Sequence, residues 1–318
     1  MWTFVTFHAN LGNETHRKLQ KRGVDLMMHS SYEAQINWLF RSAERFYPRC
    51  RKVIITDQET EFHPVIHDHI NGEIEIFRAH FPGSGAMLSR AQAQTEWLEK
   101  EVAKGGGQDS PIVMLDSDVL INRDLEPLCS LNYEIAMTYR GNDEMPINGG
   151  VFFIAPLQQE AALRFSRWVQ FIYESHFSED IWYGHQRALI ETIGWENYKN
   201  RTKIGAVLTV PPAALQNADD NRSVQAQLWH VGEWNRTVSV KWLKIRKMSS
   251  ARILHFKGPR KILMRPYFFG YLQSPQSLAG KTKKYGWRGT LYLFAGLQKS
   301  LKRLNDVRIL VSSRREAS

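Results

Sequence analysis

Residues 111–124 read PIVMLDSDVLINRD, and the interpretation of the whole chain starts from this stretch. Residues 112–115 form a short apolar run rich in branched side chains, typical of a strand buried on both faces. The run leads into Asp116-Ser117-Asp118, and side chains two residues apart on an extended chain point to the same side. Neighbouring carboxylates repel each other unless a cation lies between them. The sequence therefore suggests a divalent metal site that also holds phosphate oxygens, at the end of a core strand where α/β sheets bind ligands. The alternative is a turn that happens to contain two aspartates.

The composition describes an ordinary globular protein with a basic bias. The 318 residues are 43% hydrophobic and carry a net charge of +10. This length fits one large domain with an appendage, or two domains, and the charge favours an anionic partner such as a nucleotide, a phospholipid surface or a nucleic acid. Two cysteines, Cys50 and Cys129, form no disulfide framework. No signal peptide and no apolar run near the ~20 residues of a membrane span are evident, so the expected location is the cytoplasm.

Strand and helix patterns alternate along the first half of the chain. Strand patterns cover residues 2–7, 53–55, 70–77, 112–115, 133–138, 150–154, 206–210 and 251–256. Helical patterns cover residues 30–46, 87–102, 156–176 and 181–193. This order predicts an α/β fold with a mixed, mostly parallel sheet flanked by helices. Neither GxGxxG after the first strand nor GxxxxGK[ST] is present, which argues against a dinucleotide-binding fingerprint and a P-loop.

The last part of the chain differs from the rest. Residues 281–315 contain many lysines and arginines and a single acidic residue, Asp306. Trp287, Tyr292 and Phe294 lie among the basic residues. Apolar side chains recur there at helical spacing, at Leu293, Leu297, Leu301 and Leu304. Packing on the main domain and docking on an anionic membrane both need such a stripe. We therefore expect a main domain over residues 1–264 and a basic, aromatic, helical extension over residues 265–318.

Four segments follow one another in a recognisable order: the Asp-x-Asp, residues 147–152 (INGGVF), His185-Gln186 and residues 254–261 (LHFKGPRK). Over about residues 2–262, this order resembles the GT-A-fold glycosyltransferases, and most closely family 8. The resemblance implies transfer of a sugar from a nucleotide-diphosphate sugar, uridine-linked, to a hydroxyl of a glycan or glycolipid. It further implies retention of the anomeric configuration.

The resemblance assigns roles to particular residues. Asp116, Asp118 and His255 match the metal ligands, and a site of two carboxylates and one imidazole favours manganese, with magnesium as the alternative. Gly258 and Lys261 match diphosphate contacts, because a glycine lets the backbone approach a phosphate and a lysine adds charge. The full set of expected donor contacts is His8, Ala9, Asn10, Asp57, Arg90, Ser117, Asn148, Gly149, Gly258 and Lys261. Asn148 and Gly149 are expected in a bend that points the amide at the sugar, or else in a plain turn before a core strand.

One position departs from the family pattern. The helix that carries Asp-Gln in family 8 reads His185-Gln186 here. The resemblance places the glutamine near the anomeric carbon, whereas the acidic partner that binds the sugar is missing. Asp180 and Glu179 are candidate substitutes, and Asp143, Glu144 and Asp180 are the candidate bases of an inverting reaction.

Three other functions compete with this interpretation. A nucleotidyltransferase needs a glycine-rich basic loop after the first strand, and residues 8–14 do not supply it. A nucleic-acid-binding or scaffold protein would spread its basic residues over one face of the main domain, whereas here they concentrate in the tail, so no specific nucleic acid is expected. A catalytically silent relative is the third alternative, because of His185. The tail instead fits a lipid-linked acceptor at the inner membrane face.

Overall fold

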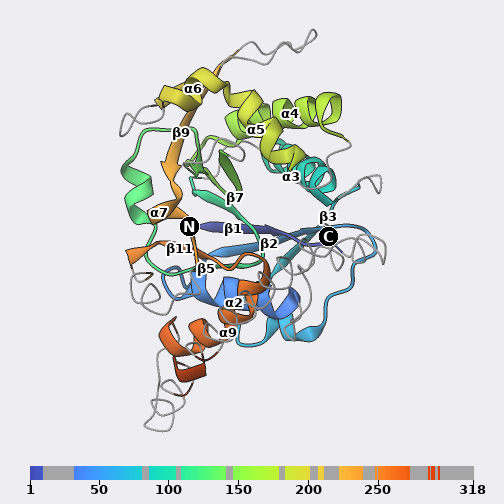
Figure 1. Ribbon diagram of the computed structural model, residues 1–318. Helices are drawn as coiled ribbons and strands as arrows, with labels where there is room; N and C mark the ends of the chain where they lie inside the picture. Colours follow the sequence, from blue (N-terminus) through green and yellow to red (C-terminus); the bar gives the residue numbers. More distant parts are fainter. Residues whose placement is uncertain are drawn as a thin grey trace, which may run out of the picture.

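The computed structural model describes residues 1–9, 32–80, 86–104, 109–140, 146–178, 183–200, 207–210, 222–238, 248, 250–272, 286, 288–290 and 293. Their centre is an eight-stranded sheet in the order β3-β2-β1-β4-β7-β6-β9-β8 (Figure 1). Its strands are β1 (Thr3–Phe7), β2 (Arg51–Thr56), β3 (Glu75–Arg78), β4 (Ile112–Leu115), β6 (Ile135–Tyr139), β7 (Ile147–Ile154), β8 (Val207–Val210) and β9 (Val224–His230). A smaller sheet has the order β10-β11-β5, with β10 (Arg236–Thr237), β11 (Ile253–His255) and β5 (Val119–Ile121).

Helices cover both faces of the large sheet. On one face lie α3 (Ala86–Ala103), α4 (Gln159–His176) and α5 (Gly184–Ile193), and on the other lies α2 (Tyr32–Glu44) (Figure 1). The remaining helical elements are η1 (Pro64–His67), η2 (Glu126–Ser130), α6 (Trp195–Asn200), α7 (Val231–Trp234), η4 (Gly258–Leu263), α9 (Met264–Tyr267) and η5 (Phe268–Leu272). None of the described helices is long and apolar enough to cross a membrane.

The central strands are apolar throughout because they face two hydrophobic cores. In β4, Ile112 and Met114 pack with Trp97 beneath α3 and α4, whereas Val113 and Leu115 pack with α2. Successive side chains of a strand point to opposite faces, so a strand between two helical layers has no solvated side. The short apolar run before Asp116 is thus explained by its place in the middle of the sheet.

The pairing confirms the predicted mixed α/β sheet. The pairs β3–β2, β2–β1, β1–β4 and β6–β9 are parallel, whereas β4–β7, β7–β6 and β9–β8 are antiparallel. A register irregularity interrupts β6–β7: Met137 pairs with Phe152, and the next residue, Thr138, pairs with Asn148. Residues 149–151 fall in this gap, which is a β-bulge of the kind that re-aims side chains beside functional sites.

Several element predictions need correction. Residues 147–149, expected in a loop or turn, are the first residues of β7, so Asn148 and Gly149 lie in a bulged strand. The strand expected over residues 70–77 is confined to Glu75–Arg78. β5 and β9 were not predicted; β9 reads VQAQLWH, and its glutamines hide the apolar pattern although Gln227 is buried.

The C-terminal prediction falls largely outside the described residues. Up to Leu272 the chain packs with the main domain, since Tyr267, Phe268 and Leu272 share a core with Trp38 of α2. Beyond this point Arg288 Nε donates a hydrogen bond to the carbonyl of Gly270, at 2.8 Å. Most of the expected basic helix of residues 281–315 lies outside the described part of the chain, and the boundary at residue 264 stays a prediction.

Candidate functional site

Three potential metal ligands meet where the two sheets adjoin. Asp116 directly follows β4, Asp118 directly precedes β5, and His255 ends β11. β5 and β11 are antiparallel neighbours with Val119 opposite His255, and the amide of Phe256 donates to the carbonyl of Asp118, at 2.8 Å. The ladder therefore fixes His255 beside the Asp-x-Asp.

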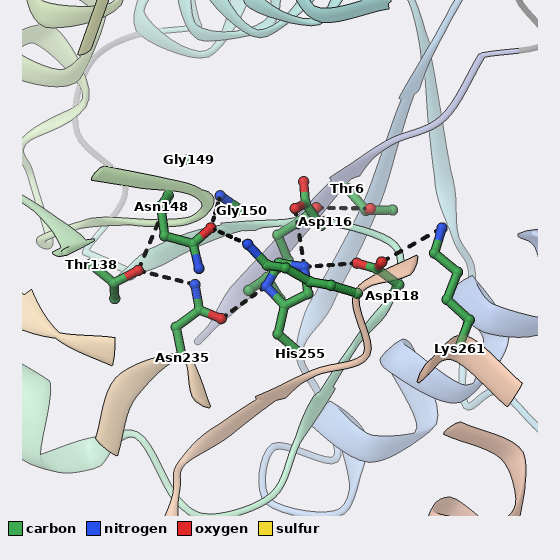
Figure 2. Close-up of polar contacts among 12 residues, drawn as sticks. Thr6, Asp116, Asp118, Thr138, Asn148, Gly149, Gly150, Asn235, His255 and Lys261 are labelled. Carbon is green, nitrogen blue, oxygen red and sulfur yellow. Dashed lines mark hydrogen bonds and ion pairs between the residues drawn. The ribbon is translucent and has the colours of Figure 1, made fainter. Parts of the chain in front are cut away.

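The ligand atoms converge on one point (Figure 2). His255 Nε2 lies 3.3 Å from Asp116 Oδ2 and 3.0 Å from Asp118 Oδ1. One ligand atom of each residue lies within 4.8 Å of the other two. This separation suits atoms that share a single ion rather than three unrelated groups.

The proton on His255 supports the same conclusion. Its Nδ1 lies 3.0 Å from Asn235 Oδ1, and an amide oxygen can only accept, so Nδ1 carries the proton. In a neutral imidazole, Nε2 then presents a lone pair. A lone pair that faces two carboxylates needs a cation between them, either a proton on Nε2 or a metal ion, and the donor set fits a divalent metal.

The strand opposite has no room for a side chain here. A Cβ on Gly150 would lie 2.2 Å from Asp116 Oδ2 and 2.5 Å from His255 Cε1. These atoms are ligand atoms or directly bonded to one, so any larger residue would displace two of the three ligands. The second glycine of the INGGVF segment is thus explained by space rather than by a turn.

Both carboxylates are ionised at neutral pH, although Asp118 is buried and Asp116 is partly buried. Burial raises the pKa of Asp116, but the charge of Arg90 and the hydrogen bond from His255 hold that pKa well below its usual value. Burial likewise raises the pKa of Asp118, while His255 and Lys261 bring it below the ordinary value. Metal ligation requires such deprotonated carboxylates.

Two of the predicted basic residues flank the cluster. Arg90 of α3 pairs with Asp116 Oδ1 and donates from Nη2 to the carbonyl of Gly149, at 3.0 Å. Lys261 of η4 lies 3.5 Å from Asp118 Oδ2, and its ammonium sits 4.9 Å from the ring centre of Tyr32. Each carboxylate thus has its own cation.

Sequence reasoning missed a third cation, Lys257. Its Nζ donates to Asn148 Oδ1, at 2.9 Å, and burial lowers the pKa of Lys257 to about 8. The same oxygen accepts from the amide of Gly150, at 3.3 Å, so the amide orientation of Asn148 is set from two sides. Its Nδ2 has no hydrogen-bond partner among the described residues. The place of Lys257 between His255 and Gly258 was the available signal.

His185 and Gln186 diverge on α5. His185 packs on β7, since a Cβ on Gly149 would lie 3.1 Å from His185 Nδ1. Burial, and then the charge of Arg90, lower the pKa of His185 to about 3, so the ring is neutral. Gln186 instead lines a cavity of about 260 Å³ with Tyr183 and Trp195, and its Oε1 has no partner within the described part of the chain.

The remaining predicted donor contacts are less closely tied to the cluster. The ring of His8 packs on Tyr32, with centroids 5.1 Å apart, and Tyr32 in turn contacts Lys261. Asp57 uses its carboxylate within its own turn, where Oδ1 accepts from the amide of Glu59, at 3.0 Å. Ser117 lies in the turn between the two aspartates, Ala9 follows His8, and Gly258 adopts a φ of 55° at the start of η4. Asn10, Asp143, Glu144, Glu179 and Asp180 lie outside the described residues.

No family model matches this sequence, and no curated protein does. Solved structures that match this chain include a glycosyltransferase involved in the glycosylation of the major capsid of PBCV-1, at 12% identity and a TM-score of 0.46 over 83% of this chain and 99% of that one. The glycosyltransferase GlyE of Streptococcus pneumoniae TIGR4 is 12% identical with a TM-score of 0.48, over 91% of this chain and 63% of that one. An active-site mutant of LgtC is 12% identical with a TM-score of 0.43, over 91% and 95%. At such values, the chemistry of the site has to decide the activity.

Proposed function

We propose that this chain is a metal-dependent glycosyltransferase of the GT-A type. It transfers a sugar from a nucleotide-diphosphate sugar, uridine-linked, to a hydroxyl of a glycan or glycolipid. One observation carries the proposal: Asp116, Asp118 and His255 Nε2 converge on one point and are flanked by Arg90, Lys257 and Lys261. A site of oxygen and imidazole ligands with lysines at its rim suits a cation that itself holds a diphosphate.

The proposed ion is Mn²⁺, with Mg²⁺ as the alternative, because one imidazole joins two hard carboxylates. When bound, it would stabilise the negative charge that develops on the departing diphosphate. Lys261 adds a positive charge on the same side, and the turn at Gly258 brings backbone close to the phosphates. His8 and its partner Tyr32 lie on the Lys261 side of the site and would hold the base.

The sugar would lie on the opposite side, near β7 and α5. Asn148 Nδ2, buried and without a partner among the described residues, would donate to a sugar hydroxyl, while Lys257 holds the amide in place. We propose retention, with Gln186 beside the anomeric carbon and a leaving phosphate oxygen that accepts the proton of the acceptor. Asp143 and Asp180 are the alternative bases of an inverting reaction.

We further propose that the protein works in the cytoplasm at an anionic membrane surface. The support is the composition of residues 281–315, where aromatic side chains are interleaved with many basic ones. Such a segment would bring the enzyme to a glycolipid acceptor.

Release of nucleoside diphosphate from a panel of nucleotide sugars, with and without Mn²⁺, tests the proposal. Slow hydrolysis of the donor needs no knowledge of the acceptor. We expect Mn²⁺-dependent release from one uridine-linked donor, reduced roughly a thousandfold in Asp118→Asn because several kcal/mol of charge stabilisation is lost. No release from any donor, together with no thermal stabilisation by uridine diphosphate and Mn²⁺, would instead identify a silent relative or a binding protein.

A further inference from the structure

We propose that Thr138 and Asn235 are positioning residues that fix the tautomer of His255 and thereby set the affinity of the site for a divalent metal. The inference rests on the proposed metal dependence. Neither residue belongs to the motifs of the sequence, and neither touches the point where the three ligands converge.

The two residues form a chain of buried hydrogen bonds behind His255 (Figure 2). His255 Nδ1 lies 3.0 Å from Asn235 Oδ1, Asn235 Nδ2 donates to Thr138 Oγ1 at 3.0 Å, and Thr138 Oγ1 donates to the carbonyl of Asn148 at 3.4 Å. Thr138 and Asn235 are 0% exposed and His255 is 1% exposed. Buried polar groups depend on one another for their partners, so the directions of these bonds are coupled.

The hydroxyl of Thr138 decides the direction of the whole chain, because it has a single proton. That proton goes to the carbonyl of Asn148, at the irregularity between β6 and β7. Thr138 Oγ1 can then only accept from Asn235, which must turn its NH₂ group toward Thr138 and its oxygen toward His255. His255 Nδ1 is thereby held as the donor, and Nε2 is the nitrogen left for a metal.

Without the Thr138 hydroxyl, the NH₂ group of Asn235 loses its acceptor, and the amide is no longer held in that orientation. Turned over, it presents Nδ2–H to His255, and Nδ1 must accept. The proton of the neutral ring then moves to Nε2, which points an N–H at Asp116 and Asp118. Such a ring donates to the carboxylates and cannot ligate a metal.

The key variant is Thr138→Val, which removes the hydroxyl at nearly constant volume, and Thr138→Ser is the matched control that keeps it. Nitrogen–proton correlation spectra of the metal-free full chain report whether Nδ1 of His255 is protonated, with its signals assigned by their loss in His255→Gln. Binding of Mn²⁺ alone is followed by electron paramagnetic resonance. We expect Thr138→Val to lose the Nδ1 proton and to bind Mn²⁺ about 10 to 100 times more weakly, whereas Thr138→Ser resembles the wild type.

A double variant separates tautomer control from general damage. A carboxylate at position 235 can only accept, so adding Asn235→Asp to Thr138→Val should restore the Nδ1 proton without the hydroxyl. If Thr138→Val keeps the Nδ1 proton and its Mn²⁺ affinity, or if the double variant fails to restore the proton, the proposal is overturned. Wild-type protein that binds no Mn²⁺ would overturn the proposed function instead, and the nitrogen spectra decide the tautomer separately.

Discussion

The two sides of the site are built on different principles. Around the aspartates each carboxylate has a cationic partner: Arg90 pairs with Asp116, and Lys261 lies beside Asp118. On the α5 side, His185 is buried and neutral, and Gln186 lines a cavity with Tyr183 and Trp195 rather than with the ligand residues. In the proposed reaction the cation and the diphosphate are the same whichever sugar is carried, so a charged, closely held frame suits them. Sugars differ in the placement of neutral hydroxyls, which neutral groups and open space can follow.

Adjacent glycines allow the sharpest test of this difference. A Cβ on Gly150 would meet Asp116 and His255 at 2.2 and 2.5 Å, whereas a Cβ on Gly149 would meet His185 Nδ1 at 3.1 Å. We expect Gly150→Ala to weaken Mn²⁺ binding by at least about 100-fold through displaced ligands. Gly149→Ala is the matched control, with Mn²⁺ affinity close to wild type. Equal effects of the two changes on Mn²⁺ titrations would show that the sides are not separate.

Lys257 lies next to the ligand cluster and donates to Asn148 of β7. We expect its removal to weaken donor binding less than Gly150→Ala weakens Mn²⁺ binding. Lys257→Met keeps most of the side-chain volume but removes the donor that orients Asn148 Oδ1. We expect about a tenfold rise in KM for the donor sugar, the loss of roughly one charge-assisted hydrogen bond, with little change in Mn²⁺ affinity. Initial rates at varied donor concentration measure this KM. A weakened Mn²⁺ affinity with unchanged KM would place Lys257 on the metal side alone.

His185 should affect stability rather than metal binding. Its pKa in the folded protein is about 3 because burial, and then Arg90, oppose the charged form, whereas an unfolded histidine titrates near pH 6.5. Only the unfolded state gains a proton as the pH falls from 6.5 towards 3, so this destabilisation is absent above pH 6.5 and reaches on the order of 2 kcal/mol by pH 5.

Urea unfolding of the wild type and of His185→Gln at pH 7.5 and pH 5 measures this difference. The variant should lose less stability between the two pH values, even if it is less stable at both. The same loss in both proteins would show that His185 does not cause the acid sensitivity.

The sequence alone was sufficient to predict those site residues that lie together in one continuous segment. The Asp-x-Asp follows an apolar run that alternates between two cores, and Lys261 follows His255 within the same motif. Asn235 could not be found this way, because it joins the site only through the pairing of β10 with β11, where Arg236 lies opposite Leu254. Lys257 lies inside the same motif, but only the fold shows that its ammonium group reaches Asn148 of β7. For β7, the bulge opposite Thr138 depends on strand register, which a turn-like Asn-Gly-Gly does not reveal.

The pairing of β5 with β11 has a consequence for how the protein opens. Asp116 and Asp118 belong to the first half of the chain, whereas Asn235, His255 and Lys261 belong to its last third, and the small sheet and the ligand cluster help to bring them together. An ion held there would act as a reversible cross-link between two parts of the chain that lie far apart in the sequence. The segment that carries His255 would then separate from the large sheet only after the ion has left, so the lifetime of the closed protein would follow the occupancy of its metal site.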